Sequence, residues 1–116
     1  MRILIVDDNA DSADACAMVL EMSGHEARAV YSGDKALAVL EEFAPQVGLI
    51  DLGMPGMDGY ELARRLRQTP AGERMMLVAL TGWDGAEVKA GVKDAGFDDH
   101  VCKPVDLNAL QQRLSR

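Results

Sequence analysis

Ile3-Leu4-Ile5-Val6-Asp7-Asp8 is an aliphatic run that stops at two acidic residues. Four consecutive aliphatic residues with a polar end are typical of a buried strand in a parallel sheet. The same pattern recurs at Val47-Gly48-Leu49-Ile50, which is followed by Asp51. Shorter or weaker patterns of this kind predict three further strands, over 26–31, 75–80 and 98–102.

Amphipathic stretches separate these strands and predict helices. Ser32 is expected to cap the second helix, and Asp58 is expected to begin the third. In the third helix, Leu62, Ala63 and Leu66 would face the core, and Arg64, Arg65 and Arg67 would face the solvent. Two glycines in or near the fourth predict a softer element. The helices are expected over 10–23, 33–44, 58–68, 84–95 and 107–114.

The alternation of strand and helix runs through the chain five times. Such a pattern predicts an α/β fold with a parallel sheet covered on both faces. A (βα)5 doubly wound, flavodoxin-like sheet with strand order 2-1-3-4-5 is the common small version. A (βα)8 barrel is excluded, because it needs about 250 residues. We therefore expect residues 1–116 to form a single domain.

Composition narrows the partners and the compartment. The net charge of −7 argues against direct binding to nucleic acid or to anionic membranes. Cys16 and Cys102 lack metal-binding spacing and are expected to be buried thiols. No long apolar run is present, so a cytoplasmic location is expected. Most of the seven methionines should fill the core, and a few could lie on a contact surface.

Chemically capable residues follow four of the strands. Asp7 and Asp8 follow the first strand, Asp51 the third, Thr81 the fourth and Lys103 the fifth. These strands are neighbours in the order 2-1-3-4-5, and the crevice of such a sheet lies beyond the carboxyl ends of its strands. Each residue alone has an ordinary explanation, such as a helix cap, a solvated acid or a strand end. It is the complete set that predicts a site.

Three carboxylates in one cleft repel one another unless a cation lies among them. Carboxylate and water oxygens suit Mg²⁺, which commonly uses one or two carboxylates together with phosphate oxygens. One carboxylate could then act as a nucleophile and form an acyl phosphate. Lys103 would pair with a phosphoryl oxygen, and the Thr81 hydroxyl could donate a hydrogen bond to another.

The sequence resembles the receiver domain of two-component response regulators over 3–114. The resemblance rests on Ile-Leu-Ile-Val-Asp-Asp-Asn (3–9), Leu-Ile-Asp-Leu-Gly-Met-Pro-Gly-Met-Asp-Gly (49–59), Ala-Leu-Thr-Gly (79–82), Ala-Gly-Phe-Asp-Asp (95–99) and Val-Cys-Lys-Pro-Val (101–105). It implies a regulatory phosphoacceptor rather than an enzyme. Its implied partners are a histidine kinase or a histidine phosphotransfer domain, and a downstream protein or a fused output domain.

The resemblance also implies a metal site. Asp51 looks like the phosphorylated residue. Asp8 and Asp51 look like direct ligands of Mg²⁺, for which Mn²⁺ could substitute. The backbone carbonyl of Gly53 looks like a third ligand, and Asp7 resembles the acid that holds the metal through water.

The remaining implied roles concern the phosphoryl group and its partner. Thr81 and Lys103 resemble the pair that holds the phosphoryl group and reports its arrival, and Lys103-Pro104 looks like the family's cis peptide. Small residues at the start of the first helix, Ala10, Ser12 and Ala13, would let a partner's phosphohistidine approach closely.

Two positions depart from the common pattern. His100 stands where the family usually has Tyr or Phe, as in receivers associated with hybrid histidine kinases. It is either a switch residue or a partly exposed ring without that role. Trp83 either covers the phosphoryl site and slows loss of phosphate, or is a surface aromatic in a docking face.

Three other functions fit the sequence less well. A pseudo-receiver that binds a partner without accepting phosphate would not need the complete set of five residues. A phosphotransferase of the Asp-x-Asp type needs an acid where Gly53 stands. A flavodoxin-like cofactor binder would need a phosphate-binding loop after the first strand, where residues 7–11 read Asp-Asp-Asn-Ala-Asp.

Overall fold

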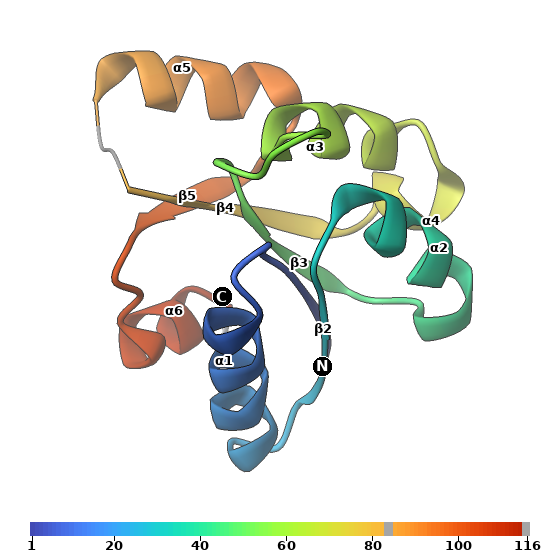
Figure 1. The fold of residues 1–116 in the computed structure, drawn as a ribbon, viewed down its shortest axis with the longest axis vertical. Coiled ribbons are helices and arrows are strands. Elements are labelled where there is room, and N and C mark those ends of the chain that lie inside the picture. The colour runs from blue at the N-terminus through green and yellow to red at the C-terminus, as the bar shows by residue number, and fades with distance from the viewer. Residues whose placement is uncertain (83–84, 115–116) are drawn as a thin grey trace.

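Five parallel strands form one sheet in the order β2-β1-β3-β4-β5, which confirms the predicted fold class (Figure 1). The computed structural model describes residues 1–82 and 85–114. The strands are β1 (Arg2–Val6), β2 (Glu26–Val30), β3 (Val47–Asp51), β4 (Met76–Thr81) and β5 (Asp99–Cys102).

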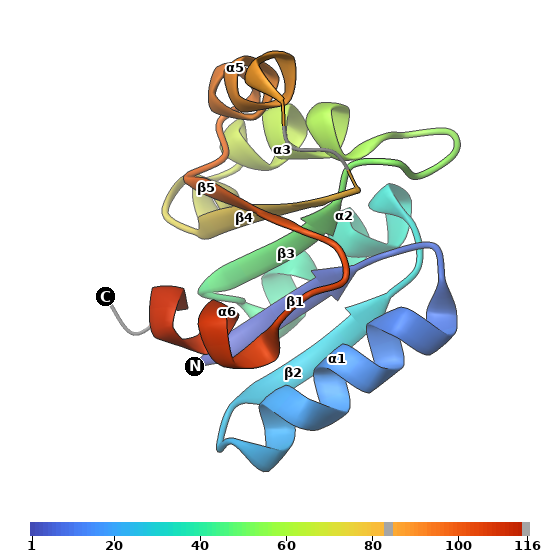
Figure 2. The same ribbon diagram turned by 90° about the vertical axis from the view of Figure 1, so that its left-hand side faces the viewer.

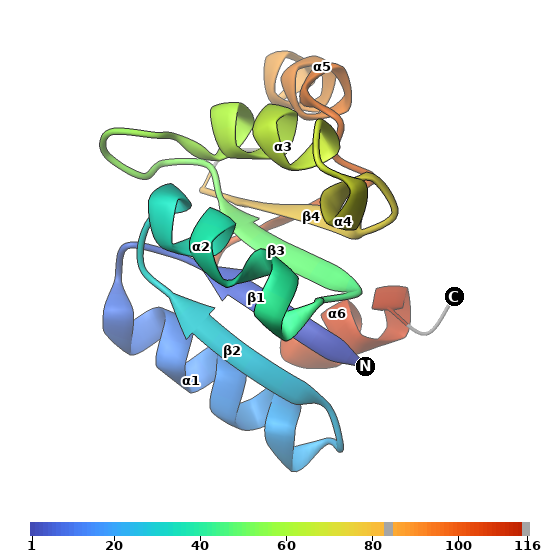
Figure 3. The ribbon, with the colours of Figure 1, turned by 90° about the vertical axis from the view of Figure 1, so that its right-hand side faces the viewer.

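Helices cover both faces of this sheet. Figures 2 and 3 show α2, α3 and α5 on one side and α1 and α6 on the other. Alternation along β1 divides the core accordingly, since Leu4 and Val6 pack towards α2 and α3, while Ile3 and Ile5 pack towards α1 and α6. The helices are α1 (Ala10–Met22), α2 (Gly33–Phe43), α3 (Gly59–Arg67), α4 (Pro70–Glu73), α5 (Ala86–Ala95) and α6 (Leu107–Leu114).

The predicted helix starts are largely confirmed. The Ser32 hydroxyl caps α2 by accepting a bond from the Lys35 amide at 3.2 Å. The Asp58 carboxylate caps α3 by accepting from the Glu61 amide at 2.9 Å. The one-turn helix α4 was not predicted. Thr69 is its N-cap, and the Thr69 hydroxyl accepts a bond from the Gly72 amide at 2.9 Å. Pro70 lies in the first turn, where proline is tolerated.

Arg67 corrects one prediction. It was expected to face solvent, but only 22% of its side chain is exposed. Its guanidinium instead donates to backbone carbonyls of the α4 region and of the turn after α5, and to the Asp98 carboxylate at 2.9 Å. The long side chain folds back over the end of α3 and ties together the segments that lead into β4 and β5.

An ion pair fixes α6 against β5. Arg113 donates to the Asp99 carboxylate at 2.6 Å, and the His100 amide donates to the other oxygen of that carboxylate at 2.8 Å. Burial alone would raise the pKa of Asp99, but the hydrogen bond from Arg113, helped by His100, holds it below its usual value.

This pair predicts a pH dependence of stability. Because the folded pKa of Asp99 is depressed, its contribution is present above the unfolded value of about 3.9 and is lost as the pH falls through the folded pKa. Urea unfolding of the wild type and of Asp99→Asn should therefore differ at neutral pH and converge in acid. A difference that does not change with pH would contradict this assignment.

None of the helices in the described parts of the chain is both long enough and apolar enough to span a bilayer.

Candidate functional site

Three carboxylates meet at the carboxyl ends of β1 and β3. Asp7 and Asp8 follow β1, Asp51 ends β3, and each offers an oxygen within 4.8 Å of the others. The pairing of Val6 with Ile50 places the ends of the two strands at the same level. Asp7 and Asp51 are 2% and 7% exposed, whereas Asp8 is open to solvent. Two buried carboxylates and one exposed carboxylate thus share one small volume.

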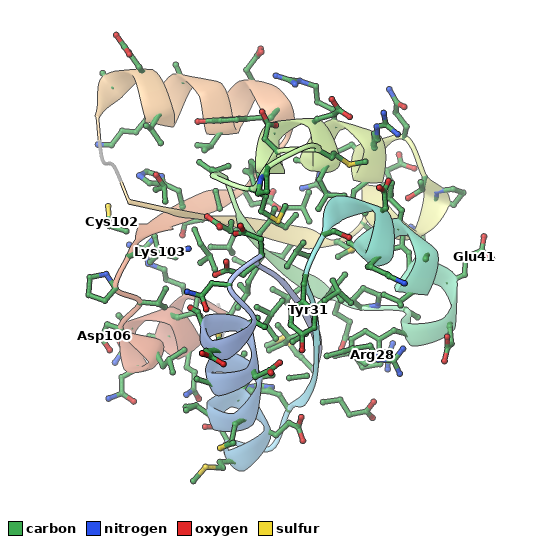
Figure 4. The ribbon with its side chains drawn as sticks, in the orientation of Figure 1. Arg28, Tyr31, Glu41, Cys102, Lys103 and Asp106 are labelled. Atoms are coloured by element: carbon green, nitrogen blue, oxygen red, sulfur yellow. The ribbon has the colours of Figure 1, made fainter. Side chains whose placement is uncertain are left out.

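Lys103 supplies the positive charge of this cluster (Figure 4). Its Nζ lies 3.2 Å from Asp7 Oδ2 and 3.2 Å from Asp51 Oδ1. Burial alone would lower the pKa of Lys103, but the hydrogen bond to Asp7 and the charges of both carboxylates raise it above its ordinary value. The ammonium is therefore a fixed cation between the two buried acids.

Backbone groups hold the two buried carboxylates in place. The Asn9 amide donates to Asp7 Oδ1 at 3.0 Å, and the Gly53 amide donates to Asp51 Oδ1 at 3.2 Å. Lys103 also contacts Asp51 at Oδ1. Both of these contacts fall on Oδ1 of Asp51.

The fourth and fifth strands bring the remaining predicted residues to the same edge. Thr81 ends β4, is 6% exposed, and its carbonyl accepts a bond from the Lys103 amide at 2.7 Å. The Lys103-Pro104 peptide is cis, as the resemblance implied. Of the three small residues at the start of α1, Ala10 and Ser12 are exposed and Ala13 packs in the core.

The two unusual positions differ in what the structure places. His100 is half-buried on β5, beside Ala79 of β4, and lines a surface hollow with Lys89 and Arg113. Whether it switches stays a prediction. Trp83 lies outside the described residues.

Two residues that shape the site were not predicted from the sequence. Asn9 caps α1 through its side chain and holds Asp7 through its amide, a dual position signalled by an Asn just before the helix. Gly59 lies so close to the Asp51 carbonyl that a Cβ there would be 2.6 Å from the oxygen. Its signal is a glycine directly after the Asp58 cap.

The cysteines correct another prediction. Cys102, expected to be buried, is exposed, and Cys16 is only partly buried. Burial, with a smaller effect from the charge of Asp7, raises the pKa of Cys16 to about 11.

This difference predicts unequal thiol reactivity. With the pKa of Cys16 at about 11, only about one Cys16 thiol in a thousand is ionised at pH 8. We expect an alkylating reagent to modify Cys102 about a hundredfold faster than Cys16, because Cys102 is exposed whereas Cys16 is partly buried and rarely ionised. Peptide mass mapping over time measures this, and the fast phase should vanish in Cys102→Ser. A fast phase on Cys16 would contradict it.

The fold and the acid–lysine cluster together define a small α/β domain with an acidic site at the carboxyl edge of its parallel sheet. The chain belongs to the response regulator receiver domain family, whose profile matches residues 3–115. It is accordingly a receiver domain of two-component signalling.

Individual relatives and structures agree with this assignment. The chain is 36% identical over 120 residues to the virulence sensor protein BvgS of Bordetella pertussis, covering 99% of the chain and 10% of BvgS. It is 33% identical over 114 residues to the transcriptional regulatory protein PhoP of Salmonella typhimurium, covering 98% of the chain and 50% of PhoP. It therefore spans only a part of either protein.

Solved structures show the same fold. The chemotaxis protein CheY4 of Vibrio cholerae matches with a TM-score of 0.94 at 26% identity, over 99% of this chain and 96% of that one. A response regulator from Chloroflexus aurantiacus, described as putative, matches with a TM-score of 0.90 at 32% identity, over 98% and 93%.

Proposed function

We propose that this chain accepts a phosphoryl group on Asp51 from a phosphohistidine of a histidine kinase or a histidine phosphotransfer domain. The observation that carries the proposal is the position of Lys103, whose Nζ lies 3.2 Å from both Asp7 and Asp51. Together with Asp8, these groups form a nucleophile, an acidic cation site and a fixed positive charge in one pocket.

The donor set fits Mg²⁺, and Mn²⁺ could substitute for it. Three carboxylates within 4.8 Å of one another offer only oxygen ligands, which these hard cations prefer. Asp8 and Asp51 would bind the cation directly, the Gly53 carbonyl would be a third ligand, and Asp7 would act through water. When bound, the cation would neutralise negative charge on the transferring phosphoryl group.

Each residue of the site then has its own role in phosphoryl transfer. A carboxylate oxygen of Asp51 forms the new bond to phosphorus while the bond from phosphorus to the partner's imidazole nitrogen breaks, and that nitrogen keeps the electron pair. Lys103, released from part of its contact with Asp51, pairs with a phosphoryl oxygen. The Thr81 hydroxyl donates a hydrogen bond to another oxygen. Water later hydrolyses the acyl phosphate.

The phosphorylated state would be relayed as a change of shape. Thr81 moves towards the new oxygen, and α5 with its flanking loops changes population. His100 is a candidate second switch residue. We place the chain in the cytoplasm as one receiver domain, a regulatory phosphoacceptor rather than an enzyme. It acts on a downstream protein or a fused output domain, and it contacts neither nucleic acid nor membrane directly.

A small-molecule phosphodonor tests the proposal. The protein is incubated with acetyl phosphate, with and without Mg²⁺, and intact mass is measured. We expect one added phosphoryl group that needs Mg²⁺ and is absent in Asp51→Asn. Asp58→Asn is the matched control, because it removes the same charge from a nearby exposed position and asparagine still caps α3. If no phosphate is added under any condition, the chain is a partner-binding pseudo-receiver instead.

A further inference from the structure

A groove between α1 and the edge strand β2 lies outside the acid cluster. Figure 2 shows these two elements side by side at one border of the sheet. The groove has a volume of about 670 Å³. Small side chains from both elements line it, namely Ala17, Ala27 and Ala29. A hollow lined by alanines can accept larger apolar side chains from outside.

Two methionines form the outer wall of this groove. Met18 and Met22 are 64% and 81% exposed, the two largest exposures among the large apolar side chains of the described residues. They are four positions apart on α1 and so lie on one helix face. Methionine side chains adapt their shape to a partner, which makes such a pair well suited to a contact surface.

The charge around the groove is negative. Asp14 and Glu21 of α1 line it, and the segment Ala10–Met22 contains no Lys or Arg. No basic residue compensates the negative end of the α1 dipole. The Tyr31 hydroxyl donates a hydrogen bond to the Asp14 carboxylate at 2.6 Å.

Arg28 lines the groove without offsetting this charge. Its guanidinium lies 4.7 Å above the Phe43 ring and 3.7 Å from the Glu42 carboxylate, and both of these residues are on α2. The charged group is therefore directed to the opposite face of the sheet from α1. Arg28 therefore brings no positive charge into the groove.

We propose that this groove is a docking site for a cationic amphipathic helix of a partner protein. Apolar side chains of that helix would enter between Met18, Met22 and the alanines, and flanking Lys or Arg side chains would meet Asp14 and Glu21. A second copy of the chain is a poorer occupant, because it would set acids against acids in a molecule of net charge −7.

A pair of designed peptides tests this proposal. Each is a helix of about 18 residues with leucines along one face, and the polar positions are lysine in one peptide and glutamate in its twin. With methyl-labelled methionine, the lysine peptide should shift the signals of Met18 and Met22 and leave that of Met57 unchanged. The glutamate twin should shift neither.

Variants separate this docking from general attraction to an acidic protein. Met22→Lys should weaken binding of the lysine peptide at least about tenfold, as loss of a central apolar contact does. Ala90→Lys adds the same charge at an exposed position of α5 and should leave the affinity within about twofold. Both variants should accept phosphate from acetyl phosphate as the wild type does, so failure here is distinct from failure at Asp51.

Three results would overturn the proposal. The first is equal binding of the lysine and glutamate peptides. The second is that the signals of Met18 and Met22 do not shift, whether or not other signals do. The third is self-association of the free chain that Met22→Lys abolishes.

Discussion

Replacing Gly59 with alanine is expected to lower the free energy of unfolding by about 3 kcal/mol, the upper end of the usual cost of overpacking. A Cβ at this position would lie 2.6 Å from the carbonyl oxygen of Asp51 and 2.8 Å from the Cα of Leu52. Both atoms belong to the backbone, so no side-chain rotation can relieve the overlap. Alanine would otherwise be favourable in the first turn of α3. Urea unfolding measures the loss.

The same variant should also slow phosphorylation of Asp51, because the overlap moves the backbone that carries this residue. Gly53→Ala is the matched control for stability in the same loop. Its Cβ would meet only Asp51 Oδ1, at 3.9 Å, and the stability should change by no more than about 0.5 kcal/mol. Equal stability of Gly59→Ala and the wild type would show that the loop yields easily, contrary to this account.

The central strands could be predicted because both of their faces are covered. Four residues of β1 and all five of β3 are buried. The sequence of each strand is therefore a continuous apolar run with a polar end. The carboxyl ends of parallel strands meet at one edge of a sheet, so the sequence could predict that this edge holds Asp7, Asp8, Asp51, Thr81 and Lys103. The structure brings these residues to that edge, while their roles in phosphoryl transfer stay predictions.

The edge strands were harder to interpret from sequence. A strand at the border of a sheet has one neighbour and one open side, so its side chains are covered less completely, and most residues of β2 and β5 are only half-buried. Cys102, the last residue of β5, is exposed. The sequence pattern does not distinguish this edge from the centre until the strand order is known.

The burial of individual charged side chains also could not be predicted from the sequence. Asp7 taken alone would be expected to be solvated, yet it is nearly fully buried, while its neighbour Asp8 is exposed. Successive residues of an extended chain point in opposite directions, and only the position of Lys103 decides which of the two can be buried at acceptable cost. A contact between residues so far apart in sequence is a property of the folded chain.

Arg67→Met should be the most destabilising substitution on the outer surface of α3. The guanidinium donates to the carbonyls of Gly96 at 2.8 Å, Gly72 at 3.0 Å and Met75 at 2.7 Å. Methionine keeps the apolar stem and removes every donor, leaving partly buried carbonyls without this partner. The expected loss in the free energy of unfolding is about 3 kcal/mol. The contact between the α4 region and the turn from α5 to β5 should loosen first. Faster amide hydrogen exchange at Leu77 and Phe97 would report this change.

Arg65→Met is the control that separates this role from the loss of a surface charge. Arg65 is two residues away on the same helix, and its side chain is 54% exposed. Among the described residues it forms one ion pair, with Glu61 one turn earlier in α3, at 2.9 Å. Because an exposed pair of this kind contributes little, its removal should change stability by no more than about 0.5 kcal/mol. If Arg67→Met were as mild as Arg65→Met, water would have to replace the lost donors at those carbonyls, and Arg67 would not hold α3 to the segments leading into β4 and β5.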